Sequence, residues 1–331
     1  MKKQITLFAM LFLSLFVFSF LHGQENGGFK MLYQVNKDEG KIIKAVAQQE
    51  LGKLLYWEKG RIMAKDINSA AGWRKYLDFN PEDLGIRLEE GKIVRIIEPG
   101  LISGFYHLPE MKKMAFLMHL GDSINSVLGV ADLAMNKVIY TNLTGYHPQV
   151  AGRRMEFMAI NNLNTTPCLS EDGRFAAYGA FTYLYVSNVE VVDLSDRTKT
   201  VIKNGYSPFI WKDRLYYSMR DEKKKMSIYS AALNDLKGEK LMDVDFEVSV
   251  AALHRGVYYI LSDKKIYSCR LDAGKSFTLI GDLETLGTGY DKSEIQKFFV
   301  ATTGKKDHVF VFMREVRKEK VEYKMYSREV N

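Results

Sequence analysis

The residues best suited to contact a ligand lie in a repeated Gly-Tyr segment. Gly145–Pro148 reads Gly-Tyr-His-Pro, Gly205–Pro208 reads Gly-Tyr-Ser-Pro, and Gly289–Asp291 is a third copy without proline. Tyr and Trp combine an apolar ring with a polar edge, which suits them to bind peptides or sugars. The alternative is a simple turn, because Gly and Pro favour turns. The predicted ligand-binding residues are Tyr146, His147, Tyr206, Trp211 and Tyr290.

Motifs for catalysis or metal binding are missing from the sequence. It contains no G-x-S-x-G elbow, H-E-x-x-H pair, P-loop or EF-hand loop. The histidines after residue 23 are scattered without metal-ligand spacing: His107, His119, His147, His254 and His308. We therefore predict no catalytic residue, no metal and no cofactor.

Paired carboxylates are the one catalytic arrangement that the composition leaves open. A glycosidase needs two of them on either side of the bond that it cleaves. The candidates are Asp78, Glu82, Asp83, Glu110 and Asp291, and nothing in their spacing pairs two of them. A carbohydrate-active hydrolase or lyase is thus the alternative to a non-catalytic binding protein.

Short runs rich in Val, Ile, Tyr and Phe, separated by Gly, Asp, Asn and Lys, predict β-strands and turns. Lys53–Trp57 and Arg61–Ala64 flank Gly60, and Ile86–Leu88 and Lys92–Ile97 flank Gly91. Both pairs are typical of hairpins, because Gly supplies the positive φ of a tight turn. The mixed charge runs at 220–225 and 314–320 are typical of exposed hairpin tips.

Two strand motifs recur in step along the second half of the chain. The first series is Phe175–Tyr178, Leu215–Ser218, Val257–Ile260 and Val309–Phe312. The second is Val191–Leu194, Ser230–Leu233 and Ser268–Leu271, and Ile228–Ser230 recurs as Ile266–Ser268 and as Met325–Ser327. A shared period of about 40 residues is typical of four-stranded propeller blades. The sequence therefore predicts an all-β propeller of six or seven blades, with seven slightly favoured. In such a ring, Gly-Tyr segments between blades would place their tyrosines around one opening.

A family resemblance supports this fold. Ser170–Tyr178, with the sequence Ser-Glu-Asp-Gly-Arg-Phe-Ala-Ala-Tyr, resembles the S-P-D-G-[KR]-x-[IL]-[AV]-[FY] blade motif of TolB-like propellers, also called WD40-like PD40 repeats. Glu171 stands where the motif has Pro, and Ala176 where it has a larger apolar residue. The resemblance implies a propeller but little about function, because one fold hosts many activities.

The first 23 residues are typical of a secretory signal peptide. Lys2 and Lys3 precede an apolar stretch from Ile5 to Leu21, and the small residue Gly23 offers a cleavage point. The alternative is a transmembrane anchor, since a span needs about 20 apolar residues. We expect an exported protein, periplasmic or associated with the outer surface of a Gram-negative bacterium, with 24–331 as one propeller domain and no membrane span after cleavage.

Charge and cysteine content exclude further classes of protein. The net charge is +7, and it is spread without a dominant basic tract, which argues against nucleic acid as a partner. The two cysteines, Cys168 and Cys269, are too few for a disulfide framework and are expected to be small buried residues. An envelope protein or a glycan is the expected partner.

Overall fold

The computed structural model describes residues 28–44, 52–80, 102–119, 125–146, 167–181, 187–221, 225–246, 248–273 and 276–330. The signal segment, the hairpin expected at 86–97 and His147 lie outside these residues. None of the described residues belongs to a helix long and apolar enough to cross a bilayer.

The described strands form six blades. Blade 1 contains β2 (Lys53–Glu58), β3 (Arg61–Asp66) and β4 (Arg74–Asp78). Blade 2 contains β5 (Ile102–Leu108), β6 (Lys113–His119), β7 (Asn125–Asp132) and β8 (Lys137–Tyr146). Blade 3 contains β9 (Cys168–Leu169), β10 (Phe175–Phe181), β11 (Ser187–Asp193) and β12 (Lys199–Lys203). Blade 4 contains β13 (Gly205–Trp211), β14 (Arg214–Arg220), β15 (Met226–Ala232) and β16 (Glu239–Val244). Blade 5 contains β17 (Val250–His254), β18 (Val257–Ser262), β19 (Lys265–Arg270) and β20 (Thr278–Asp282). Blade 6 contains β21 (Lys292–Thr303), β22 (Lys306–Arg317), β23 (Lys320–Val330) and β1 (Lys30–Val35).

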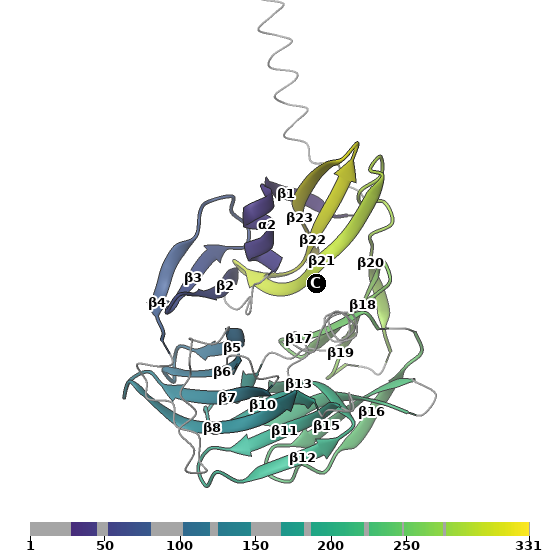
Figure 1. Ribbon diagram of the computed structural model, residues 1–331. Coiled ribbons are helices and arrows are strands. Elements are labelled where there is room, and N and C mark those ends of the chain that lie inside the picture. The colour runs from purple at the N-terminus through teal and green to yellow at the C-terminus, as the bar shows by residue number, and fades with distance from the viewer. Residues whose placement is uncertain are drawn as a thin grey trace, which may run out of the picture.

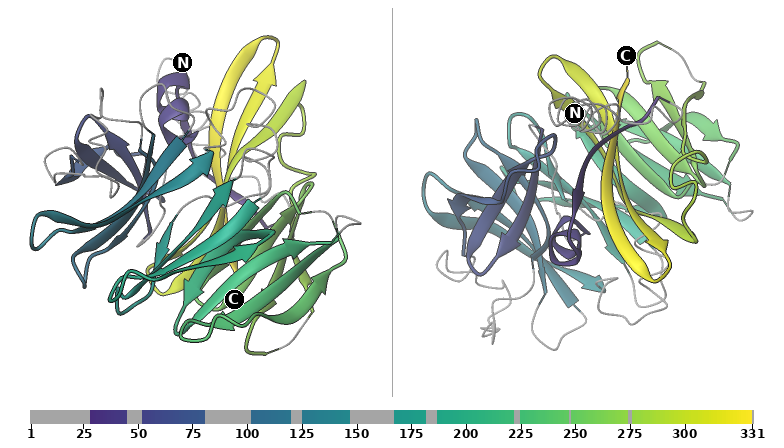
Figure 2. Two further views of the ribbon diagram at one scale, coloured as in Figure 1. Left: turned by 60° about the horizontal axis from the view of Figure 1, so that its bottom comes forward. Right: turned by 90° about the horizontal axis from the view of Figure 1, so that it is seen from above.

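The blades follow one another around a ring in chain order, and blade 6 lies between blades 5 and 1 (Figures 1 and 2). The first strands of neighbouring blades contact one another: β5 with β9, β9 with β13, and β17 with β21. These first strands therefore line the axis of the ring, and each chain segment moves outward from the axis through its blade. The fold is a β-propeller, as the sequence predicts.

The two repeated motifs occupy equivalent places in successive blades. The first series lies on the second strands β10, β14, β18 and β22, and the second lies on the third strands β11, β15 and β19. The recurring segment Ile228–Ser230 has its copies on β19 and on β23, the third strand of blade 6. Paired blades bury both faces of each strand, which explains the continuous apolar runs. On β18, Tyr258 and Ile260 pack against blade 4, whereas Tyr259 and Leu261 pack against blade 6.

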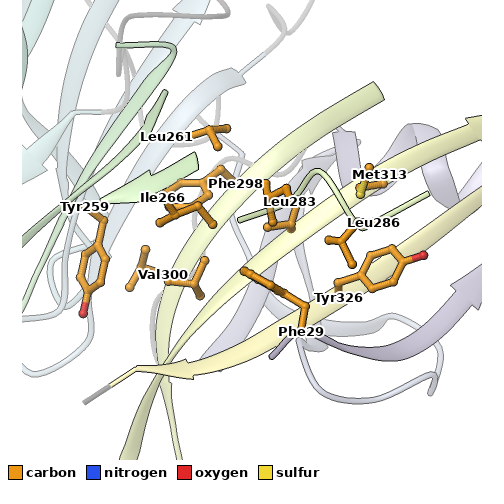
Figure 3. Packing of buried hydrophobic residues seen from close by; sticks show 12 residues of the cluster. Phe29, Tyr259, Leu261, Ile266, Leu283, Leu286, Phe298, Val300, Met313 and Tyr326 are labelled. Atoms are coloured by element: carbon orange, nitrogen blue, oxygen red, sulfur yellow. The ribbon is translucent and has the colours of Figure 1, made fainter. Parts of the chain in front are cut away.

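A buried apolar cluster joins each blade to the next. Between blades 5 and 6, for example, Tyr259, Leu261 and Ile266 face Phe298 and Val300 (Figure 3). Equivalent clusters join blades 1 and 2, 2 and 3, 3 and 4, and 4 and 5. Cys168 and Cys269 are buried and free within these clusters, which confirms their expected role.

Closure of the ring pairs the first described strand with the last. Strand β1 pairs antiparallel with β23, from Lys30 opposite Ser327 to Val35 opposite Tyr323, and so supplies the outermost strand of blade 6. The helix α2 (Lys37–Lys44) follows and lies between blade 6 and blade 1 (Figure 1). Its Ile43 is fully buried among residues of both blades. The N-terminal segment therefore closes the propeller.

The sequence slightly favours seven blades over six, and the described strands form six. The described blades begin at Lys53, Ile102, Cys168, Gly205, Val250 and Lys292, so blades 1 and 2 take more residues than blades 3 to 5. Blade 6 has strands of 11 and 12 residues, longer than the strands that set the 40-residue period in blades 3 to 5. The period of the regular blades thus overestimates the number that the chain can form.

Candidate functional site

Strand direction gives the ring two faces. On the first, which we call the crossover face, the chain passes from the outer strand of one blade to the first strand of the next, at 203–205, 244–250 and 282–292. On the opposite hairpin face lie the turns that follow the first strands, at 109–112, 170–174, 212–213, 255–256 and 304–305. A residue's position along a first strand therefore decides the face on which it lies.

Tyr206 lies on the crossover face, at the start of β13. Asn204 and Ser207, on either side of it, have φ of 59° and 47°, in the left-handed region that few residues other than Gly adopt. The pairing of β13 with β14 is irregular between Tyr206 and Phe209, where Ser207 lies. The backbone thus leaves regular strand geometry on both sides of a half-buried tyrosine.

Contacts from blade 3 hold this irregular backbone in place. Ser187 donates a hydrogen bond from Oγ to the carbonyl oxygen of Gly205 at 2.7 Å, and the Asn204 amide donates to Oδ1 of Asn188 at 3.2 Å. The Arg220 guanidinium lies 5.9 Å from the centre of the Tyr206 ring. Backbone strain that the surroundings enforce is concentrated at functional sites in proteins. Tyr206 and Arg220 therefore form the best-defined candidate contact on this face.

Trp211 lies at the other end of β13, on the hairpin face. It packs over Gly256 in the first hairpin of blade 5, and a Cβ added to Gly256 would lie 2.2 Å from the indole. The Lys212 ammonium lies 4.4 Å from the centre of the indole ring. Because seven residues of strand span about 20 Å, the structure does not bring Trp211 and Tyr206 together.

Tyr290 lies on the crossover face, just before β21, in a buried charged network. Its hydroxyl donates to Glu322 at 3.0 Å and accepts a hydrogen bond from Lys324, whose ammonium also lies 4.3 Å from the ring centre. Lys324 forms an ion pair with Glu315 at 2.8 Å, and Tyr326 donates to Glu315 at 2.9 Å. Tyr290 thus fastens the connection between blades 5 and 6 to blade 6.

The ionised forms of Glu322 and Lys324 are stabilised by the groups that they contact. A hydrogen bond from Lys320, and others from Tyr290 and Lys324, lower the pKa of Glu322 to about 2. Burial favours the neutral form of Lys324, but its bonds to Glu315 and Tyr290 outweigh burial and raise its pKa. Glu315 is fully buried, so the prediction of an exposed tip at 314–320 fails at this residue.

Tyr146 is the last residue of β8, and its backbone pairs with Asn125 and with Phe181 of blade 3. This position belongs to the crossover face. Its side chain and the whole of His147 lie outside the described residues. Of the five predicted ligand-binding residues, Tyr146, Tyr206 and Tyr290 therefore share a face, and Trp211 lies on the opposite one.

The hairpin face carries a His-Thr-Asp cluster without the geometry of a catalytic relay. His254 Nε2 lies 2.9 Å from Thr302 Oγ1 and 3.4 Å from Asp307 Oδ1, and Thr302 donates to Asp307 at 2.5 Å. In a relay, one ring nitrogen faces the hydroxyl and the other faces the carboxylate. Here the same nitrogen faces both, so the cluster joins blade 5 to blade 6.

Carboxylates are scarce along the axis in the part of the chain that the structure describes. Among the first strands β5, β9, β13, β17 and β21, only β21 carries an acid, Glu294, and it is ion-paired with Lys292 and Arg314. Asp78 lies on the outer strand β4, Glu110 lies in an exposed turn, and Asp291 accepts a hydrogen bond from the Lys318 amide. Nor do the described residues contain a cluster of three potential metal ligands.

The blade motif at 170–178 has a structural role. Arg174 donates two hydrogen bonds to Asp193 Oδ2, at 3.0 and 2.6 Å, and so joins β10 to the end of β11. This contact lowers the pKa of Asp193 to about 2. Ser170 accepts a hydrogen bond from the Phe175 amide across the turn at 2.8 Å. The residues that carry the resemblance therefore stabilise the blade, and their polar groups already form hydrogen bonds within it.

The chain is a six-bladed β-propeller. No protein-family model and no curated protein matches its sequence. Among solved structures, it is similar to TolB from Acinetobacter baumannii, with 12% identity, a TM-score of 0.46, and coverage of 86% of this chain and 66% of that one. It is also similar to the β-propeller domain of the Trilobed protease from Pyrococcus furiosus, with 13% identity, a TM-score of 0.43, and coverage of 88% and 82%.

A third similar structure comes from a study of two prolyl endopeptidases, with 15% identity and a TM-score of 0.41. This match covers 63% of this chain and 33% of that one. The chain thus spans just under two thirds of the TolB chain and a third of the endopeptidase chain. These likenesses concern the fold, and the function of the propeller has to be inferred from its own residues.

Proposed function

We propose that this protein is an exported, non-catalytic binding scaffold of the bacterial cell envelope, and that it holds a protein or glycan partner on its crossover face. Export rests on the signal-like segment at residues 1–23. The site is centred on Tyr206 and Arg220, and Tyr146 and Tyr290 lie on the same face. His147 belongs to the same predicted set but lies outside the described residues. Trp211 belongs to the opposite face and has no part in this site.

The geometry around Tyr206 is the observation that carries this proposal. Left-handed φ values at Asn204 and Ser207 cost free energy. Hydrogen bonds with Ser187 and Asn188 of blade 3 hold the backbone at Asn204 and Gly205. A turn between blades needs neither a tyrosine nor an adjacent guanidinium. Tyr and Arg are also the residues, with Trp, that dominate the binding energy of protein interfaces.

Capture of a partner from solubilised envelope tests the proposal. The tagged protein and its Tyr206→Ala and Arg220→Ala variants are compared after mild crosslinking, and the captured partners are read by mass spectrometry. We expect both variants to lose a reproducible partner by at least tenfold, as hot-spot truncations of about 1.4 kcal/mol or more do. The matched control is Trp211→Leu, which removes an aromatic ring from the other end of the same strand.

The control must retain the partner, and all variants must unfold cooperatively like the parent protein. Equal loss in Trp211→Leu would place the partner elsewhere or show a general defect in folding. Retention of every partner by Tyr206→Ala would contradict the proposed face. Secretion of the full-length chain, with the mature N-terminus read by sequencing, tests export separately.

A further inference from the structure

Cations occupy the tips of the hairpin face on three successive blades. Lys212, Arg255 and Lys305 lie in the two-residue turns after the first strands of blades 4, 5 and 6, and all three are exposed. Because these turns directly follow the strands that line the axis, the three cations border the opening of the ring. We call them the cationic arc.

Contacts between adjacent turns hold the arc in a defined arrangement. The Trp211 indole packs on Gly256, so the turn of blade 4 touches the turn of blade 5. Arg255 lies 3.5 Å from Asp307 of blade 6, and His254 contacts Thr302 of the same blade. The cations therefore project from turns that are fixed relative to one another.

The charges of the arc are only partly neutralised by the protein itself. Within the described residues, Lys212 and Lys305 form no ion pair, and the Arg255 side chain remains 64% exposed beside Asp307. Asp307 is already bonded by Thr302. The acids near Lys212 are the exposed Asp213 and Asp272, and Asp272 is ion-paired with Arg270. The arc is thus a surface of positive charge open to an anionic ligand.

Trp211 adds an aromatic surface to this charge. Its ring is half-buried on the hairpin face, next to Lys212. Aromatic rings with nearby polar groups bind sugars, since the ring contacts the apolar face of the sugar and the polar groups bind its substituents. A tryptophan beside cations therefore favours an anionic sugar over a simple inorganic ion.

The extent of the arc over three blades favours a polymer over a small anion. Packed β-sheets lie about 10 Å apart face to face, so the cations recur at about the distance between blades. An extended polymer of repeated negative charges can contact cations on successive blades at once, whereas a small anion can contact only one. We propose that the cationic arc and Trp211 bind an acidic polysaccharide on the hairpin face. This inference does not rest on the proposed function, which concerns the opposite face.

Affinity electrophoresis with polygalacturonate as the probe tests the inference on the complete chain. The first variant, Lys212→Ala/Arg255→Ala/Lys305→Ala, removes the arc. The matched control is Lys59→Ala/Lys264→Ala/Lys318→Ala, which removes three exposed cations from two-residue turns of blades 1, 5 and 6 on the crossover face. In blade 1, β2 begins at the hairpin face, because Gly52 lies against Thr302 at the end of β21, so the turn at Lys59 opens on the crossover face. Both variants lose the same net charge. Trp211→Leu tests the aromatic contribution, and Tyr206→Ala tests independence from the proposed function.

We expect the arc variant to bind polygalacturonate at least tenfold more weakly than the parent, Trp211→Leu to bind severalfold more weakly, and the control and Tyr206→Ala to stay within twofold. Equal weakening of the arc variant and its control would overturn the inference, because it would show unspecific attraction. Failure of the parent to bind polygalacturonate above neutral dextran would overturn it as well. Equally tight binding of poly-glutamate would contradict the polysaccharide as the ligand class.

Discussion

The indole of Trp211 lies directly over Gly256 of the next blade, so close that a Cβ on Gly256 would lie 2.2 Å from the ring. Gly256 also has a φ of +78°. Two independent constraints thus demand glycine at this position. We predict that Gly256→Ala lowers the free energy of unfolding by about 2–4 kcal/mol through strain and overpacking, as measured by urea denaturation. In the Trp211→Leu background, the same substitution should cost less. An equal cost in both backgrounds would mean that Trp211 does not form this contact.

The buried ion pair between Lys324 and Glu315 gives a second prediction. Lys324→Met leaves the fully buried Glu315 carboxylate without its cation. Removing one partner of a buried pair costs about 3–5 kcal/mol, and thermal and urea unfolding should show a loss of that order. Lys320→Met, which removes the ion pair between the exposed Lys320 ammonium and Glu322, should cost less than about 1 kcal/mol. Similar losses in the two variants would contradict the buried network.

Acid stability follows from the lowered pKa of Glu322. Hydrogen bonds from Lys320, Tyr290 and Lys324 bring its pKa from the ordinary 4.5 to about 2 in the folded protein. A carboxyl with a lowered folded pKa stabilises the fold above its unfolded pKa, and this stability is lost as the pH falls through the folded value. Urea midpoints should therefore decline between about pH 4.5 and pH 2. Glu322→Gln should flatten that decline, whereas Glu329→Gln, at an exposed carboxylate, should not.

Closure by β1 predicts unequal effects from two neighbouring residues. Phe29 is fully buried between blades 5 and 6, whereas Met31 is 42% exposed on the same segment. Phe29→Ala should destabilise the whole propeller by about 3–5 kcal/mol, and Met31→Ala by less than about 0.5 kcal/mol. A stable protein after Phe29→Ala would mean that the N-terminal strand does not close the ring.

The sequence predicts the blades well because their physics is local and repeated. The second and third strands carry apolar residues on both faces, so Val257–Ile260 and Val309–Phe312 resemble each other closely enough to reveal the period. Closure by β1 leaves no such signal, since Lys30 and Ser327 pair across almost the full length of the chain. A register between distant segments cannot be inferred from local composition.

Site residues are harder to predict because their meaning depends on position along a strand. Tyr206 and Trp211 are close in sequence, yet they lie at opposite ends of β13 and on opposite faces of the ring. Glu315 looks like one member of a surface charge run, but the strand places it under the connection that ends at Tyr290. Strand direction and the neighbouring blade decide the position of both residues, and a single sequence motif contains neither.

A photocrosslinking amino acid placed at position 206 or at position 211 tests the central claim most directly. The two sites differ only in the end of β13 at which the probe lies, so each reports on one face of the same folded protein in intact cells. The account predicts a discrete crosslinked partner from position 206 and none of the same mass from position 211. Crosslinking of that partner from 211 alone, or no crosslink from 206, would contradict a binding site on the crossover face.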